Sequence, residues 1–223
     1  QPVKEIAQKF LKNYKEVNLS PKATPIDKII QKIILVEQSS KLDKLKKIID
    51  VEKIYQAIIF TRTKKRADNL AKALSKNKLS AMSFHGDKRQ SQRTRILSSF
   101  KQNKLSFLIA TDVAARGIDI DDIMFIINYD LPTQPEIYVH RIGRTARAGK
   151  EGVAISFCDK TETKRLVEIE KLIGYKFNIK SKETEKKHKI QYDKNKSYNK
   201  YIKKNKARKK FKNKSSKTSN YKK

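Results

Sequence analysis

Residues 56–84, QAIIFTRTKKRADNLAKALSKNKLSAMSF, decide the fold of this 223-residue chain. Two short apolar runs, QAIIFT (56–61) and LSAMSF (79–84), enclose a segment whose apolar residues recur at helical spacing: Ala67, Leu70, Ala71 and Leu74. Short apolar strands separated by amphipathic helices are typical of a parallel sheet with helices on both faces. The stretch therefore predicts a strand, a helix and a second strand of an α/β fold.

The same alternation extends in both directions from this unit. Upstream, we expect a strand at 32–38 and a helix at 41–53; downstream, we expect strands at 106–111, 124–129 and 152–158, with helices at 90–101 and 161–173. We therefore predict a three-layer α/β domain over residues 31–180, with a mainly parallel sheet between helices. Ligands of such folds gather at the carboxyl ends of the strands.

Two segments outside this domain differ in composition. Residues 1–30 contain short helical stretches and the extended connector SPKATP, and we interpret them as a linker. Residues 181–223 hold 18 Lys/Arg against 3 Asp/Glu and few apolar residues, which predicts a disordered basic tail. This tail either binds nucleic acid, through its lysines and stacking rings, or only keeps the chain in solution. The rings belong to Tyr192, Tyr198, Tyr201, Phe211 and Tyr221.

The net charge of the chain is +31, and both the domain and the tail are basic. A polyanion partner is one explanation, because basic side chains release condensed counterions when they neutralise phosphates. The other explanation is an AT-rich genome that places Lys and Asn on solvated surfaces. No stretch approaches the roughly 18 apolar residues of a membrane span, and the single cysteine, Cys158, builds neither a disulfide framework nor a Cys-rich zinc site. We expect no membrane partner, no metal ligands and a cytoplasmic location.

Three candidate segments directly follow predicted strands: FTRTK (60–64), HGD (85–87) and ATDVAARGID (110–119). Gly86 and Gly117 lie in them, in a chain with only six glycines, and glycine permits a close backbone approach to a ligand. Helix starts add free N–H donors for phosphate. Each segment alone fits an ordinary turn. Together they predict a phosphate-lined cleft at one edge of the sheet.

A fourth segment, YVHRIGRTARAGK (138–150), concentrates arginine in a chain with 43 Lys and 11 Arg, and we expect it at the same edge. If residues 136–147 are helical, His140, Arg144 and Arg147 lie on one face. Like charges so placed repel by roughly a few tenths of a kcal/mol, and Gly143 costs about 1 kcal/mol in a helix interior. An anion between the guanidinium groups explains why the segment accepts both costs, since arginine fits phosphate bidentately. The alternative is a solvated basic face.

The four segments together resemble the C-terminal RecA-like domain of DEAD-box RNA helicases. The resemblance rests on IIFTRTK, HGD with QSQR, ATDVAARGIDI and HRIGRTARAG, and it covers residues 1–180 in order. It implies a RecA-like fold and an ATP-dependent enzyme that unwinds RNA duplexes or remodels RNA–protein complexes. The pattern departs from the family at Ala146, where many relatives have glycine, and we expect the methyl group to be tolerated.

The resemblance also implies roles for individual residues. Arg144 and Arg147 are implied to be arginine fingers that reach ATP phosphates. Gly117 and Asp119 are implied to contact the ribose side of the nucleotide. His140 and Arg141 are implied to contact an acidic motif of the partner domain. On the RNA side, it implies backbone contacts without base readout. The residues implied there are Arg62, Thr63, Gly86, Gln90, Arg93, Thr111 and Arg116.

Residues 1–85 contain no glycine, so they hold no phosphate loop of the G-x-x-x-x-G-K-[ST] type, and the chain contains no DEAD string. We therefore expect the second half of a two-domain helicase that is inactive alone. ATP and Mg²⁺ are the expected cofactors, with Mg²⁺ held mainly by the first domain. RNA and that first RecA-like domain are the expected partners. Two alternatives stay open: a non-catalytic RNA-binding or annealing module, and a DNA helicase or other remodelling ATPase.

Overall fold

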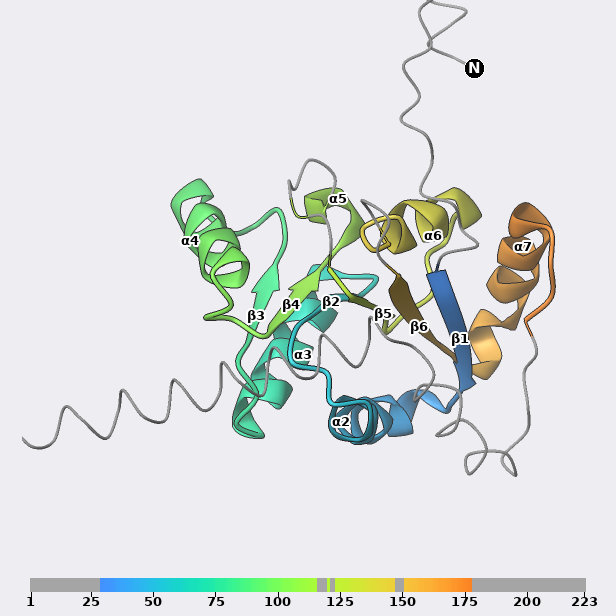
Figure 1. Cartoon of the computed structure of the whole chain (residues 1–223), viewed down its shortest axis with the longest axis horizontal. Helices are drawn as coiled ribbons and strands as arrows, with labels where there is room; N and C mark the ends of the chain where they lie inside the picture. Colours follow the sequence, from blue (N-terminus) through green and yellow to red (C-terminus); the bar gives the residue numbers. More distant parts are fainter. Residues whose placement is uncertain (1–28, 116–119, 121–122, 147–150, 178–223) are drawn as a thin grey trace, which may run out of the picture.

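The computed structural model describes residues 29–115, 120, 123–146 and 151–177. These residues form a six-stranded sheet between two layers of helices (Figure 1). They cover most of the domain predicted at 31–180. Residues 1–28 of the predicted linker and the whole predicted tail at 181–223 lie outside the described residues.

The sheet is parallel throughout. Its strands are β1 (Ile29–Leu35), β2 (Ala57–Phe60), β3 (Ala81–Phe84), β4 (Phe107–Ala110), β5 (Phe125–Asn128) and β6 (Gly152–Cys158). Their order across the sheet is β1-β6-β5-β2-β4-β3, and each pair of neighbours is parallel. The parallel sheet predicted from the apolar runs is confirmed. The first strand begins three residues earlier than predicted, because residues 29–31 pair with residues 152–154 of β6.

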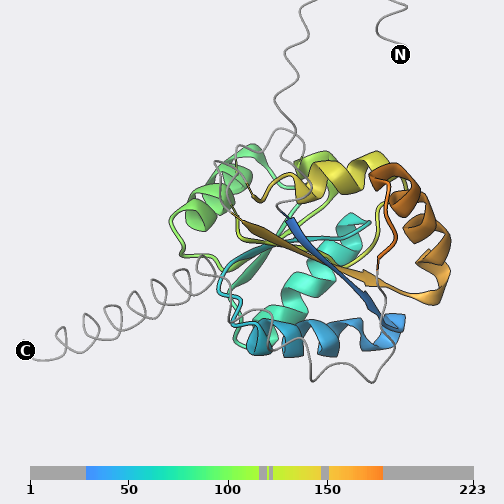
Figure 2. The ribbon, with the colours of Figure 1, turned by 45° about the vertical axis from the view of Figure 1, so that its right-hand side comes forward.

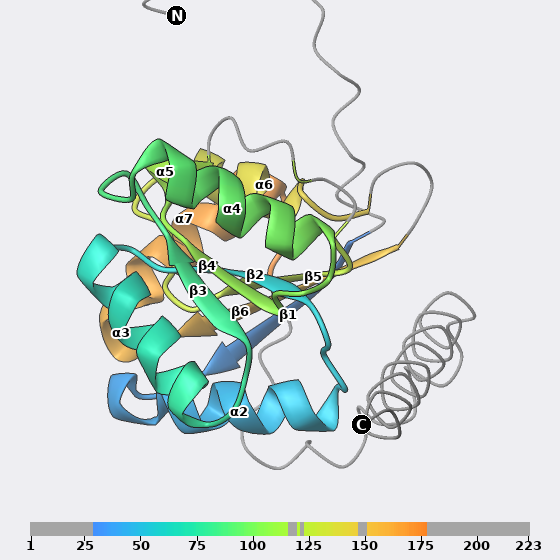
Figure 3. The same cartoon turned by 90° about the vertical axis from the view of Figure 1, so that its left-hand side faces the viewer.

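Helices cover both faces of the sheet, as predicted. One face carries α2 (Lys41–Val51) and α3 (Lys64–Lys76); the other carries α4 (Gln90–Lys101), α5 (Asp112–Ala115), α6 (Pro135–Ile142) and α7 (Thr163–Ile173). Figures 2 and 3 show these layers from two further sides, with the blue and teal helices below the sheet. Two 3-10 turns, η2 (Gln38–Ser40) and η3 (Lys160–Glu162), precede α2 and α7.

Alternate residues of each strand pack against opposite layers. Ile59 of β2 belongs to the cluster formed with α2 and α3, whereas Ile58 and Phe60 belong to the cluster formed with α4 and α5. All residues of β2, β4 and β5 are buried, as expected for parallel strands that helices cover on both sides. A third cluster, which includes Tyr138 of α6 and Leu166 of α7, covers β1 and β6.

The start of α3 fixes the chain direction after β2. Thr63 is the N-cap residue of α3, and its hydroxyl oxygen accepts the N–H of Arg66 at 3.2 Å. Such a cap satisfies one of the free N–H groups of the first helical turn. The cap therefore orients Arg62 and Thr63 at the carboxyl edge of the sheet, where the loops after all six strands lie.

Candidate functional site

Arg141, near the end of α6, is 2% exposed and binds groups of its own domain. Its Nε and one terminal nitrogen donate to the two carboxylate oxygens of Asp112 at 2.5 and 2.8 Å. The other terminal nitrogen donates to Asn128 Oδ1 at 3.0 Å and to the Asp130 carbonyl at 2.8 Å. The guanidinium carbon lies 4.9 Å from the ring centroid of Phe60. Arg141 therefore joins α6 to α5 and to the end of β5, and its contact with a partner domain stays a prediction.

A helix that continues through residues 136–147 was the condition for placing His140, Arg144 and Arg147 on one face, and it is not met, because α6 ends at Ile142. The next N–H groups bond carbonyls three residues earlier, Arg144 N at 3.2 Å and Thr145 N at 3.1 Å. Ala146 then has a φ of 56°, so the chain leaves the helix direction. The expected cost of an interior glycine at Gly143 does not arise, because Gly143 is the C-cap residue.

This earlier helix end changes the position of Arg144. Its carbonyl accepts the N–H of Ile123 at 3.4 Å, two residues before β5 begins. Its guanidinium donates to the Ala115 carbonyl, at the end of α5, at 3.5 Å. Arg144 therefore lies beside the amino end of β5, and its predicted place at the carboxyl edge is wrong. The reason is that α6 starts at the carboxyl edge and runs back across the sheet.

The other residues predicted on the nucleotide side are only partly described. His140 is exposed on α6, one position before the buried Arg141. Gly117, Asp119 and Arg147 lie outside the described residues, as does Arg116 on the predicted RNA side.

The turn after α6 is tightly packed. Ala146 has the left-handed conformation in which alanine costs about 1 kcal/mol more than glycine, but it is 4% exposed and shares an apolar cluster with Leu131 and Ile142. Thr145 is fully buried, and a Cβ built at Gly152 would lie 2.0 Å from its Oγ1. The turn therefore requires a glycine at the first residue of β6.

The remaining residues predicted to contact RNA lie at the carboxyl ends of β2, β3 and β4, as predicted. The N–H of Thr111 donates to the Phe84 carbonyl at 3.3 Å. Arg93 places its guanidinium carbon 5.1 Å from the Phe84 ring centroid and donates to Gln90 Oε1 at 3.2 Å. Gly86 is exposed, and a Cβ there would meet no atom within 4 Å. Packing within the described residues therefore does not explain why position 86 is a glycine.

Asp68, on α3, holds the HGD segment in place and was missed from the sequence. Its Oδ1 accepts from Ser83 Oγ at 2.5 Å and from Lys88 Nζ at 3.0 Å, and it lies 3.1 Å from His85 Nε2. Burial opposes ionisation, but these hydrogen bonds outweigh it and hold the pKa of Asp68 below its usual range. The loop that carries Gly86 is therefore attached to α3 by a charged hydrogen-bond cluster.

A buried ionic network lies at the carboxyl ends of β1, β5 and β6. Lys41, the first residue of α2, is fully buried. Its Nζ lies 2.7 Å from Glu162, 3.1 Å from Asp159 and 3.5 Å from Asp130. One fully buried lysine is thus matched by three carboxylates, in agreement with the rule that buried charges are paired.

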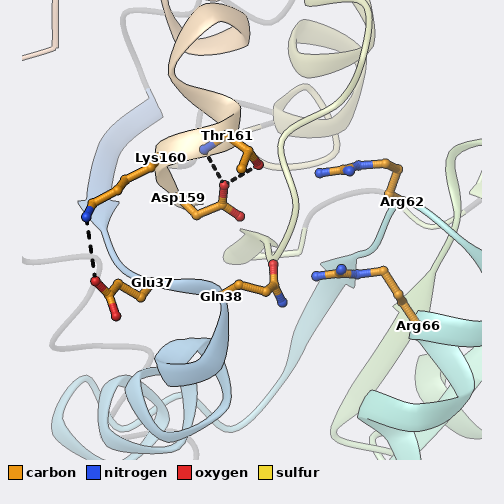
Figure 4. Close-up of a pocket in the computed structure, with 7 residues that line it drawn as sticks. All are labelled: Glu37, Gln38, Arg62, Arg66, Asp159, Lys160 and Thr161. Carbon is orange, nitrogen blue, oxygen red and sulfur yellow. Dashed lines mark hydrogen bonds and ion pairs between the residues drawn. The ribbon is translucent and has the colours of Figure 1, made fainter.

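Arg62 and Arg66 extend this network from the β2 side. A terminal nitrogen of Arg62 donates to Glu162 at 2.7 Å, and one of Arg66 donates to Asp130 at 2.6 Å. Both guanidinium groups point into a pocket of about 340 Å³ (Figure 4). The pocket is lined by Glu37, Gln38, Arg62, Arg66, Asp159, Lys160 and Thr161. Of these residues, only Arg62 was predicted from the sequence. Asp130 and Asp159, which follow β5 and β6 closely, could have indicated a charged cluster at this edge of the sheet.

Two further observations concern the chemistry that the described residues allow. Within the described ranges, no helix is long and apolar enough to cross a membrane, and no group of three or more His, Cys, Asp or Glu could hold a metal ion. Burial raises the pKa of the Cys158 thiol to about 11. The thiol therefore stays protonated, and poorly nucleophilic, at neutral pH.

Comparison with known proteins now decides the family. Residues 40–149 match the conserved C-terminal domain of helicases. The structure is similar to that of the E. coli DEAD-box protein SrmB bound to regulator of ribonuclease activity A, with a TM-score of 0.64 and 31% identity over 67% of this chain and 88% of that chain. The chain belongs to the DEAD-box helicase family. Its RecA-like fold is that of a DEAD-box C-terminal domain.

Two further DEAD-box proteins show how far the similarity extends. S. cerevisiae Dbp5 bound to RNA and ADP BeF3 has a TM-score of 0.67 and 36% identity, over 78% of this chain and 46% of that chain. The DEAD-box ATP-dependent RNA helicase CshA of Bacillus licheniformis is 42% identical over 170 residues, which are 76% of this chain and 35% of the relative. The chain thus spans about a third of the length of the CshA relatives.

Proposed function

We propose that this chain is the second RecA-like domain of an ATP-dependent RNA helicase that unwinds RNA duplexes or remodels RNA–protein complexes. It works with a first RecA-like domain, which supplies the phosphate loop and most of the Mg²⁺ contacts. The DEAD-box membership supports this proposal, as does the similarity to Dbp5 bound to RNA and ADP BeF3. The observation that carries it is the partly buried ion pair between Arg141 and Asp112.

This ion pair joins the two segments that carry the proposed nucleotide contacts. In the sequence, α5 leads directly into Gly117 and Asp119, and α6 leads into Arg144 and Arg147. Fixing α6 against α5 therefore fixes the origins of both segments relative to each other. Arg144 and Arg147 stabilise the negative charge that develops on the transferred phosphoryl group, which is the role of arginine fingers.

Two neighbouring roles complete the nucleotide side of the proposal. Gly117 and Asp119 contact the ribose side of ATP. The exposed His140 takes part in the contact with the first domain. Arg141 supports that contact through its position, since its own nitrogen atoms bond Asp112, Asn128 and Asp130.

On the RNA side, the carboxyl edge of the sheet grips the sugar-phosphate backbone. The proposed contacts are Arg62, Thr63, Gly86, Gln90, Arg93, Thr111 and Arg116. Those that the structure describes follow β2, β3 and β4, three strands that are adjacent in the sheet. Such contacts position a strand without reading its bases, as an enzyme that acts on many sequences requires.

The test is reconstitution of ATP hydrolysis. The chain is mixed with the first RecA-like domain of a CshA relative, and RNA-stimulated ATP hydrolysis is measured for each part and for the mixture. We expect turnover in the mixture and none in the chain alone. Arg144→Ala removes it, by about a thousandfold or more for an arginine finger, while RNA binding stays within about twofold of the parent chain. Lys72→Ala, an exposed position on α3, serves as the control.

Each of three other outcomes would contradict one part of the proposed function. RNA binding without hydrolysis in any mixture supports a non-catalytic binding or annealing module and contradicts the motor role. Equal stimulation by RNA and by single-stranded DNA contradicts RNA specificity. Normal turnover with Arg144→Ala contradicts the finger assignment alone.

A further inference from the structure

The pocket between η2, η3 and the first turn of α3 has no role in the contacts proposed above, apart from Arg62. It lies at the carboxyl edge, across the ends of β1, β6 and β2, and Figure 4 shows both arginine side chains extending into it from one side. Gln38 and Asp159 face them, and Lys160 lies at the rim, 3.9 Å from Glu37. With a volume of about 340 Å³, the pocket has room for a phosphate group.

The charges around the pocket do not balance. The buried and half-buried groups are four cations, Lys41, Arg62, Arg66 and Arg165, and three carboxylates, Asp130, Asp159 and Glu162. At the rim, Glu37 and Lys160 compensate each other. One positive charge is therefore left in a partly desolvated site, which favours a ligand with one negative charge.

Arg62 and Arg66 also present guanidinium groups that the domain itself uses only in part. Arg62 and Arg66 each employ a terminal nitrogen in an ion pair with a fully buried carboxylate. The two side chains nevertheless stay 33% and 32% exposed, and Figure 4 shows their guanidinium ends directed into the pocket. Their Nε atoms are buried, so the terminal nitrogens are the donors that a ligand can reach. Two adjacent guanidinium groups with spare N–H donors match the two free oxygens of a phosphodiester.

We propose that this pocket binds one phosphodiester group of the RNA strand, with Arg66, Arg62 and Gln38 as ligands. The inference rests on the proposed function, since the same sheet edge carries the other RNA contacts. Arg62 follows β2 directly, and β2 is the neighbour of β4, which ends before Thr111. A strand that passes Gly86 and Thr111 along this edge reaches Arg62 next. The pocket therefore continues the RNA path beyond β2, toward β6 and β1.

The sharpest test is Gln38→Glu, which changes one exposed amide into a carboxylate without changing its size. The new charge faces two arginines, so folding is unaffected or favoured, whereas a phosphate is repelled. The 223-residue chain is titrated with a single-stranded oligouridylate of about 12 nucleotides at several salt concentrations. We expect the affinity to fall three- to tenfold and the salt slope to decrease by about 0.7, the value for one phosphate contact to a single strand.

Two control variants separate the pocket from general charge effects. Gln102→Glu makes the same change at an exposed residue after α4, at the amino edge, and is expected to bind RNA like the parent chain within about twofold. Arg66→Gln removes the main ligand and is compared with Lys72→Gln, which removes one charge from the exposed side of the same helix. We expect Arg66→Gln to weaken binding more than Lys72→Gln.

The outcomes distinguish this inference from the proposed function. If the parent chain binds no RNA, both fail. If Arg93→Gln weakens RNA binding but Gln38→Glu equals Gln102→Glu, the proposed function stands and the phosphate pocket is wrong. If Gln38→Glu leaves RNA binding unchanged but abolishes binding of an oligoglutamate peptide, the pocket takes an acidic protein segment, and the proposal is overturned.

Discussion

The guanidinium group of Arg141 and the carboxylate of Asp112 form two parallel hydrogen bonds of 2.5 and 2.8 Å inside the domain. The pair connects α6 with α5, and Arg141 is 2% exposed. Its strength depends on the fork shape of the guanidinium, which a lysine cannot reproduce. Arg141 is therefore a positioning residue for the segments on either side of it, whatever further contacts it makes.

Arg141→Lys is expected to lower the free energy of unfolding by about 3 kcal/mol, because one nitrogen cannot replace the bonds to Asp112, Asn128 and Asp130. Urea unfolding of the two chains measures this difference. Arg95→Lys, on the exposed side of α4, is the control and is expected to change stability by less than about 0.5 kcal/mol. A loss as small as that of the control would show that the pair with Asp112 contributes little.

Lys78→Gly is expected to stabilise the fold. Lys78 follows α3 with a φ of 60°, a left-handed conformation that costs a side chain about 1–2 kcal/mol. Glycine removes this cost but adds about 0.4–1 kcal/mol of unfolded-state entropy, so the net gain is about 0.5–1 kcal/mol. Thermal unfolding measures it. Lys76→Gly, at the last residue of the same helix, is expected to destabilise the fold instead, because glycine is unfavourable within a helix.

Asp159→Asn is expected to weaken the acid dependence of stability. Burial opposes ionisation of this carboxyl group, but hydrogen bonds from Thr161 and Lys41 outweigh it and lower its pKa. The folded chain thus binds this proton more weakly than the unfolded chain. The stabilisation is complete above about pH 4, the ordinary aspartate pKa, and is lost as the pH falls further.

Urea unfolding at neutral pH and near pH 3 tests this expectation. Asp159→Asn should cost about 1–3 kcal/mol at neutral pH and should lose less stability than the parent chain on acidification. Asp43→Asn is the control, since Asp43 pairs with the neighbouring Lys46 on the helix surface and its side chain is 80% exposed. Parallel pH profiles for the parent and Asp159→Asn would contradict the assignment.

Arg93→Gln is expected to weaken binding of single-stranded RNA by about three- to tenfold and to reduce the salt slope by about 0.7. The guanidinium of Arg93 is held over the Phe84 ring, and its buried Nε lacks a partner among the described residues. Arg95→Gln, two positions later and exposed, is the matched control. Equal effects of the two changes would mean that α4 contributes only general positive charge.

The order of strands and helices could be predicted from the sequence because local patterns specify it. The four-residue strand β2 is buried throughout, so its continuous apolar run indicates a strand. The helix α3 is indicated by the helical spacing of its buried residues, Ala67, Leu70, Ala71 and Leu74. The start of β1 was missed because Gln31 and Lys32 interrupt its apolar run. Only the pairing with β6 reveals that the strand begins earlier.

The candidate site was less predictable, since its contacts connect distant parts of the chain. Nothing in the spacing of Arg141 and Asp112 indicates that they meet across 29 positions. Lys41 resembles any surface lysine in the sequence, yet it is fully buried among carboxylates from two later loops. The end of α6 was misjudged because helical spacing continues through Arg144, while Gly143 and the left-handed Ala146 stop the helix.

The close contact between Gly152 and Thr145 has a consequence for how this part of the molecule tolerates change. Position 152 has no room for even a methyl group, because Thr145 fills that volume and is itself fully buried. A substitution at position 152 would therefore displace Thr145, the neighbour of Arg144, without altering any charged residue. The effect of such a variant on the surroundings of Arg144 would be purely steric.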